Sequence, residues 1–226
     1  MRPLIIMNGE KIDWFHTVIR MLMYLAGVAV LALGMSLQTA SGLGIAALMC
    51  FATTLSMLTG KTLGFWITAT YVAYIVAQFT ILRREFQPRI LLGLCFSTLI
   101  GGFTDFFMAV NPLHPAALPI QVETMLLSLA VTAFGVSLVV NMGVVPNAPD
   151  GLVQVIAEKI KRRFGDVKVV FDCSHVAVSL VLSLALMHNL GGFGVTTAIS
   201  ALFLGHVINI ANKLFAQRFV RAAFGK

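Results

Sequence analysis

Six polar side chains lie in or beside apolar stretches that are long enough to cross a membrane. They are Asp105, Asp150, Asp172, His175, His206 and Asn209. Placing Asp, Lys or Arg at the centre of a membrane helix costs about 2.5–3.5 kcal/mol, so such residues are kept mainly where they have a function. We therefore interpret these six residues as candidates for binding a substrate.

The spacing of four of them indicates pairs on one helix face. Asp172 and His175 are three residues apart, as are His206 and Asn209. Side chains three or four residues apart on a helix are neighbours, so each pair could share a hydrogen bond or a proton. The alternative for Asp172 is a structural ion pair with Lys168, one turn earlier. Asp105 lies near the end of its apolar stretch, where it could reach the membrane interface.

Asp150 belongs to a proline-rich turn with two open interpretations. It follows Pro149, where it would cap the helix that comes next. Alternatively, this turn and a matching turn at 41–45 enter the protein from opposite sides and face a solute between them. Helix N-termini favour anions whereas carboxylates favour cations or zwitterions, so the sequence leaves the solute unidentified.

The composition predicts that lipid is the main solvent of this chain. Of its 226 residues, 58% are hydrophobic and 11% are charged, against about 25% charged residues in a soluble domain. Apolar stretches of about 20 residues match a hydrocarbon core about 30 Å thick. We predict an all-α polytopic membrane protein with six transmembrane helices at 16–37, 64–82, 90–110, 122–141, 168–187 and 195–215.

Two further segments predict short re-entrant or interfacial helices. Residues 43–59 are apolar but short and are bounded by glycines. Residues 150–164 carry five charged side chains after Asp150, and their apolar residues fall on one face at helical spacing. The second segment therefore lies at the membrane surface or dips part way in, and the first is either re-entrant or interfacial.

The basic residues predict the orientation. If segment 43–59 does not cross, 14 of the 16 Lys and Arg residues fall on one side. The positive-inside rule then places both termini in the cytoplasm, for a multi-pass protein of the cell membrane. This topology accounts for the net charge of +7, so nucleic acid is not an expected partner, whereas the lipid bilayer is, and a homo-oligomer remains open.

The chain also carries an internal repeat, with one half at 16–110 and the other at 122–215. The segment 34–37 matches 135–138, Gly60 matches Gly165, and 101–105 matches 205–209, at offsets of 101 to 105. Three crossings in each half is an odd number, which predicts two inverted-topology repeats. Many secondary transporters have this design and bind their solute between the repeats.

The turns between these segments resemble those of the YczE/YyaS/YitT-like integral membrane protein family. The matching motifs are Thr59-Gly60, Met-Gly-Val-Val-Pro at 142–146, Pro-Asp-Gly-Leu at 149–152, Leu-Gly-Gly-Phe-Gly-Val-Thr-Thr at 190–197 and Ala-Leu-Phe-Leu-Gly-His at 201–206. The chain differs where the family usually has Pro-Trp-Asp, here 44–47, and where many members have Arg before Asp-Gly, here 147–150. The resemblance implies a fold and a membrane location, and no particular substrate.

Motifs of enzymes and cofactor sites are absent from the sequence. It contains no HExxH, GxSxG or P-loop, and Cys50, Cys95 and Cys173 have no metal-ligand spacing. We therefore expect no catalytic residue, no metal and no cofactor. The prediction is a transporter of an unknown small solute, with proton coupling through Asp172, His175 or Asp105 as an option. The alternatives are a non-transporting scaffold or regulator of a partner complex, and a lipid translocase.

Overall fold

The computed structural model describes residues 7–8, 11–61, 63–85, 88–110, 115–144, 147–188 and 193–224. Apart from a two-residue ladder between β1 (Met7–Asn8) and β2 (Lys11–Ile12), these residues form helices and turns. The α-helices are α1 (Trp14–Ala40), α2 (Cys50–Thr59), α3 (Leu63–Leu82), α4 (Leu92–Val110), α5 (Leu118–Met142), α6 (Ala148–Lys159), α7 (Phe164–Leu182) and α8 (Val195–Phe224). The shorter turns are η1 (Ala47–Met49), η2 (Arg83–Glu85), η3 (Pro88–Leu91) and the π-helical η4 (Ser183–Met187).

Five helices of the described chain are long and apolar enough to cross a membrane. They span Trp14–Ala40, Phe65–Leu82, Leu118–Met142, Phe164–Leu186 and Val195–Phe224. The helical membrane character predicted from composition is therefore present. The remaining predicted span, 90–110, corresponds to α4, whose apolar stretch runs from Leu92 to Thr104.

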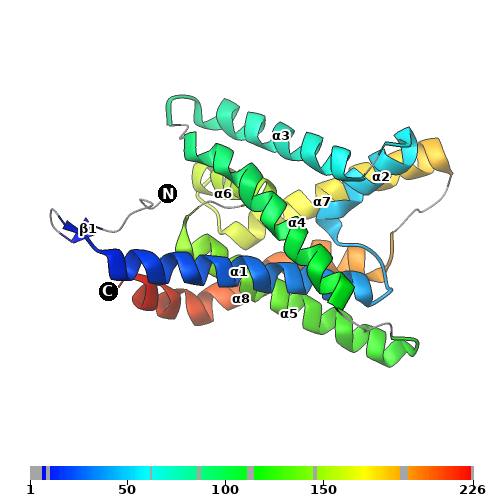
Figure 1. Cartoon of the computed structure of the whole chain (residues 1–226). Helices are drawn as coiled ribbons and strands as arrows, with labels where there is room; N and C mark the ends of the chain where they lie inside the picture. Colours follow the sequence, from blue (N-terminus) through cyan, green and yellow to red (C-terminus); the bar gives the residue numbers. More distant parts are fainter. Residues whose placement is uncertain are drawn as a thin grey trace.

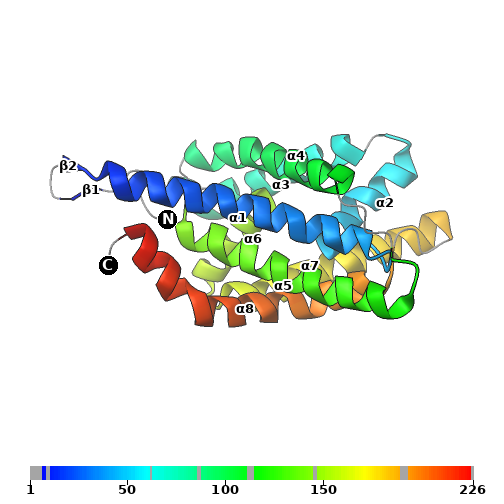
Figure 2. The same ribbon diagram turned by 60° about the horizontal axis from the view of Figure 1, so that its bottom comes forward.

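The helices pack around a central pair, α1 and α5, which lie side by side along much of their length (Figures 1 and 2). Helix α8 packs on α5 and α7, while α4 crosses α1. Helix α6 packs against α3 and α7, and α2 contacts the same two helices. Both ends of the described chain lie at the same end of the molecule (Figure 1).

Glycines set the close approach of α1 and α5. A Cβ atom added to Gly34 would lie 2.6 Å from the backbone nitrogen of Thr132, and one added to Gly135 would lie 2.5 Å from that of Leu31. Small residues at such positions let helix backbones meet, which is how helices gain packing contacts in lipid. The main apolar core, which includes Val28 and Val136, lies around this contact.

The outer surface is apolar and part of the interior is polar, as expected for a protein in lipid. Exposed hydrophobic side chains include Val76 and Phe79 of α3, Val181 of α7 and Phe203 and Leu214 of α8. Fully buried polar side chains include Arg20, Ser128, Ser137 and Thr196. Polar groups at membrane depth must be satisfied inside the protein, which the burial of these side chains allows.

Arg20 shows how one such group is satisfied. It lies in α1 with no exposed surface, and its guanidinium donates to the carbonyls of Met142 and Gly143 at 2.7 and 2.9 Å. Those carbonyls lie at the C-terminus of α5, where the last C=O groups have no N–H partner within the helix. The guanidinium also lies 5.1 Å from the centre of the Phe224 ring. Arg20 therefore caps α5 and connects three helices.

The second short segment, α6, enters the protein with its first residues. Residues 148–153 at the start of α6 are all buried, whereas Glu158 and Lys159 at its end are exposed. Helix α6 thus dips inward with its N-terminus. The helix ends at Lys159 rather than continuing to 164, so Lys161, Arg162 and Arg163 lie in the turn before α7.

The first short segment begins at a turn that α8 holds in place. Thr196 donates its backbone N–H to Leu43 O at 3.1 Å, and the Thr197 hydroxyl donates to Ile45 O at 2.7 Å. The backbone N–H of Ala47 donates to the Ser200 hydroxyl at 3.2 Å. This turn therefore has its backbone groups bonded to protein, as irregular backbone at membrane depth requires.

Candidate functional site

Three charged side chains meet in the interior, between α6 and α7. The ammonium nitrogen of Lys168 lies 3.1 Å from Asp150 Oδ1 and 3.1 Å from Asp172 Oδ1. The exposed fractions of Lys168, Asp150 and Asp172 are 2%, 5% and 1%. Since two carboxylates share one ammonium, this buried ion cluster carries an excess negative charge when all three groups are ionised.

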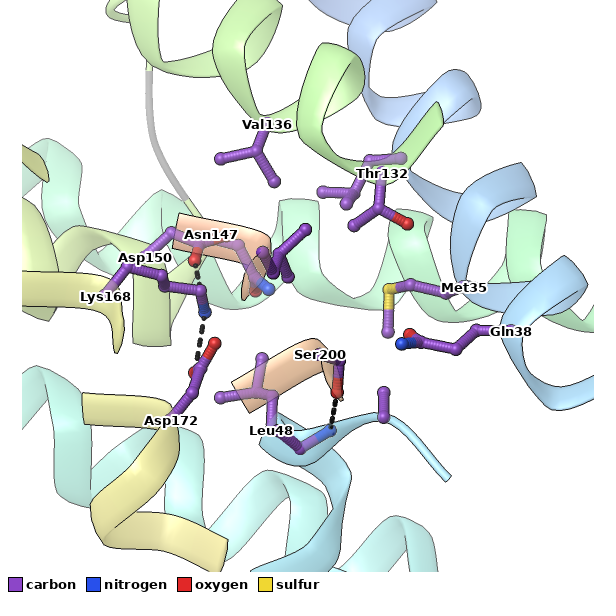
Figure 3. Close-up of a pocket in the computed structure, with 14 residues that line it drawn as sticks. Met35, Gln38, Leu48, Thr132, Val136, Asn147, Asp150, Lys168, Asp172 and Ser200 are labelled. Carbon is purple, nitrogen blue, oxygen red and sulfur yellow. Dashed lines mark hydrogen bonds and ion pairs between the residues drawn. The ribbon is translucent and has the colours of Figure 1, made fainter. Parts of the chain in front are cut away.

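The ion cluster lines a small cavity of about 40 Å³ (Figure 3). Its wall is built by α1, α5, α6, α7, α8 and the start of the first short segment. The apolar part of the wall includes Leu31, Met35, Leu48, Val136 and Leu204. A cavity of this size can hold a few water molecules where polar partners are available.

Besides the two carboxylate oxygens that are ion-paired with Lys168, two buried polar atoms of the cavity wall have no hydrogen-bond partner among the described residues. They are Nε2 of Gln38 and Oγ1 of Thr132, whose residues are 2% and 5% exposed. Both lie on the side of the cavity opposite the ion cluster (Figure 3). Leaving a buried donor or acceptor without a partner costs about 1–3 kcal/mol, so these two atoms are suited to meet a bound molecule.

The first residues of both short segments contribute to this wall. Ala46 and Ala47 come from the turn before α2, and Asn147 and Asp150 come from the start of α6. Asp150 lies in the first turn of α6, whose N-cap residue is Asn147. Asp150 is therefore one turn too late to cap the helix. Its carboxylate instead faces Lys168, while the helix N-terminus adds a favourable positive end nearby.

Asp172 and His175 do not act as a pair in the structure. His175 Nδ1 lies 2.8 Å from Phe171 O, and its Nε2 lies 2.6 Å from the Tyr74 hydroxyl. A carbonyl can only accept, so Nδ1 carries the proton and the Tyr74 hydroxyl donates to Nε2. His175 thus joins α7 to α3 and is absent from the residues that line the cavity.

His206 and Asn209 lie on α8, away from the cavity. His206 is exposed, and its Nδ1 lies 3.0 Å from Leu202 O of the preceding turn. Asn209 donates to Asp166 Oδ1 at 2.7 Å and accepts from the backbone N–H of Gly165 at 3.1 Å. Asn209 therefore binds the start of α7 to α8.

Asp105 lies in α4, and its side chain is outside what the structure describes. In the described part of the chain, no group of three or more His, Cys, Asp or Glu side chains is placed to hold a metal ion. Of the six candidate residues, the structure brings Asp150 and Asp172 together at one cavity.

Lys168, Gln38 and Thr132 were not among the candidate residues. The signal for Lys168 was present in the sequence, because its spacing to Asp172 indicated an ion pair that we treated as the structural alternative. Gln38 and Thr132 carry no such signal, since uncharged polar residues are common in membrane helices. Their place in the cavity follows from the packing of α1 against α5.

The chain was compared with known families, curated proteins and solved structures. Residues 18–213 match the family described as "Family of unknown function (DUF6198)". Neither a curated protein nor a solved structure matches. The matched residues run from the first helix to the last and include every residue of the ion cluster and the cavity wall, and the chain belongs to this family of unknown function.

Proposed function

We propose that this protein is a membrane transporter of a small solute, which binds at the central cavity. The observation that carries the proposal is the buried ion cluster of Asp150, Lys168 and Asp172 beside a cavity with two unpartnered polar atoms. Charged groups inside a membrane protein are costly and serve mainly ion pathways, proton relays and substrate sites. A scaffold would be better served by a closed apolar interior.

Reciprocal contacts between α1 and α5 support the proposed inverted repeat. Gly34 meets Thr132, and Gly135 meets Leu31. Adding the offset of 101 to Gly34 gives Gly135, and adding it to Leu31 gives Thr132. A two-fold relation between two halves produces such a pair of contacts, because when one residue meets a second, the counterpart of the first meets the counterpart of the second.

The C-termini of α1 and α5 support the same relation. Gly42 follows α1 with φ +71°, and Gly143 follows α5 with φ +60°, again 101 residues apart. Arg20 caps the turn at Gly143, and Gln121, its counterpart at the same offset, lies nearest the position of a Cβ atom on Gly42, at 3.7 Å. The site of the proposed transporter would then lie between the two halves, where α1, α5 and both short segments meet.

The proposed topology has six crossings, with α4 as the sixth, and cytoplasmic termini. It predicts that cysteines placed at Arg84, Arg162 and Ala222 are protected from an impermeant thiol reagent in intact cells. Cysteines at Ala116 and His188 should react. The five variants are made in a chain whose native cysteines are replaced. Labelling of the Arg84 variant in intact cells would mean that segment 43–59, which contains α2, crosses the membrane and that the six-span topology is wrong.

The transport proposal is tested by removing one charge from the ion cluster. A thermal-shift screen of metabolites identifies solutes that bind the folded protein, since such binding raises its apparent stability. Uptake of a binding solute into proteoliposomes is then measured. The D172N variant keeps the side-chain shape but leaves a neutral Asp150–Lys168 pair. We expect uptake to fall at least tenfold in D172N and in D150N.

The matched control for these variants is E158Q, which removes an exposed carboxylate near the other end of α6, outside the buried ion cluster. Its uptake should equal that of the wild type. Uptake in D172N at the wild-type rate, with normal expression, would remove Asp172 from the site. A screen and an uptake assay that both give no solute would favour the scaffold or regulator. Movement of fluorescent lipid between leaflets would favour the lipid translocase.

A further inference from the structure

The ion cluster is a site built for an ammonium group. Two carboxylate oxygens, one from α6 and one from α7, each lie 3.1 Å from the same ammonium nitrogen. An ammonium has three N–H donors, and both carboxylates are almost completely buried, away from bulk solvent. In the resting structure this site is filled from within the chain, by Lys168.

The charge balance of the ion cluster is negative when all three groups are ionised. Asp150 and Asp172 are both in contact with Lys168, and one ammonium neutralises only one of the two carboxylates. A buried charge without full compensation is unfavourable, by several kcal/mol for an isolated ion. The cavity therefore favours a cation over an anion, which would add to the imbalance, and exchange of one ammonium for another leaves the balance unchanged.

The opposite wall supplies contacts for the remainder of such a molecule. Gln38 Nε2 is a buried donor and Thr132 Oγ1 a buried hydroxyl, and neither has a partner among the described residues. The side chain of Gln38 extends toward the middle of the cavity in Figure 3. Met35 and Leu48 also line the cavity and offer apolar contact.

We propose, building on the transport proposal, that the solute is a small organic ammonium ion, whose charged group takes the place of the Lys168 ammonium between Asp150 and Asp172. A short carbon chain then lies against Met35 and Leu48, and a polar end group reaches Gln38 and Thr132. Lys168 suits the part of a tethered competitor, because its flexible four-carbon stem can withdraw the charge and return it. Its return would displace the bound solute.

The proposal is tested by thermal stability of the purified protein with methylammonium chloride as the probe. Methanol is the neutral compound of similar size, sodium formate provides an anion, and sodium chloride matches the ionic strength. We expect methylammonium to raise the melting temperature in a saturable manner, and the other three to give no such rise. The D150N variant, in which Lys168 neutralises the one remaining carboxylate, should lose the response.

A second variant tests the competition. Lys168→Ala removes the tethered ammonium and leaves both carboxylates, so the dissociation constant for methylammonium should fall at least tenfold. If that variant does not fold alone, its expression in the presence of n-propylammonium, which restores the missing part of the side chain, should recover folded protein. K159Q, which alters an exposed lysine at the end of α6, should respond as the wild type does.

Three results would overturn the proposal. First, an equal rise of the melting temperature with sodium chloride would mean a general cation or salt effect. Second, an unchanged response in D150N would place the amine elsewhere. Third, no response to methylammonium in either the wild type or Lys168→Ala would mean that the cluster accepts no outside ammonium. The transport proposal is judged separately by uptake. Uptake of a neutral or anionic solute, with no amine binding, would contradict only the inference of an ammonium solute. Amine binding without any uptake would contradict only the transport proposal.

Discussion

Replacing Lys168 with methionine is expected to destabilise the protein by about 3–5 kcal/mol, because it leaves two carboxylates buried together without a counter-charge. Methionine keeps the length and apolar stem of lysine, so little packing is lost. The carboxylates of Asp150 and Asp172, which both contact the Lys168 ammonium, would repel one another in an environment with almost no water. The melting temperature in detergent and the yield of folded protein should both fall.

Neutralising the carboxylates should restore most of that loss. In the triple variant K168M/D150N/D172N no charge remains, so the two uncompensated carboxylates that destabilise K168M are absent. The triple variant should therefore melt well above K168M, although we expect it to bind no solute. If K168M alone melts like the wild type, the three side chains do not form a closed ion cluster, and the proposed site loses its basis.

The helical membrane fold could be predicted from the sequence because it depends on local and cumulative properties. Each long helix is a run of apolar residues, and its length is set by the thickness of the hydrocarbon core. The predicted spans end at 37 and 141, whereas α1 and α5 continue to Ala40 and Met142, before Gly42 and Gly143, which adopt the left-handed conformation that stops a helix. The ends of α6 were predicted less well. The helical spacing of its apolar residues predicted a helix to 164, but Lys161 takes a positive φ of 54° and the chain turns there.

The site was predicted only in part, because its parts come from helices far apart in the sequence. A helical spacing shows which side chains share a face, and it does not show what that face contacts. His175 was paired with Asp172 on this basis, whereas both of its ring nitrogens are occupied by Phe171 and Tyr74. Asn209 likewise has the spacing of a site residue but binds Asp166 and Gly165.

The free-energy cost of burying a charged side chain was a better guide to the site than helical spacing was. The carboxylates of Asp150 and Asp172 are expensive to bury, and the structure places both at the cavity with Lys168, the third expensive group. Arg20 is equally costly and is satisfied by carbonyls at the end of α5. The sequence could not show whether a buried charge lies at a site or binds a helix end. Every helix ends in carbonyl groups without a helical partner, and any of them can accept from a buried cation.

A single added methyl group should also destabilise the contact between α1 and α5. Gly34→Ala would place a Cβ 2.6 Å from the backbone nitrogen of Thr132, and Gly135→Ala would place one 2.5 Å from that of Leu31. Backbone atoms cannot rotate away, so the helices must separate. Overpacking of this kind costs about 1–3 kcal/mol, and more where the packed elements must move apart. Gly102→Ala on α4 is the matched control, since no atom lies within 4 Å of the added Cβ.

The same two substitutions also test the two-fold relation between the halves. If Gly34 and Gly135 are counterparts in one reciprocal contact, each substitution forces the same separation of α1 from α5, and the two should lower the melting temperature by similar amounts. Neighbouring substitutions that share one displacement are not additive, so the double variant should lose clearly less stability than the sum of the single losses. Because the helices separate once, the second methyl group finds space that the first has already opened. Strictly additive losses of unequal size would mean that the two glycines make independent contacts, and the sequence repeat would then lack a structural counterpart at the centre of the protein.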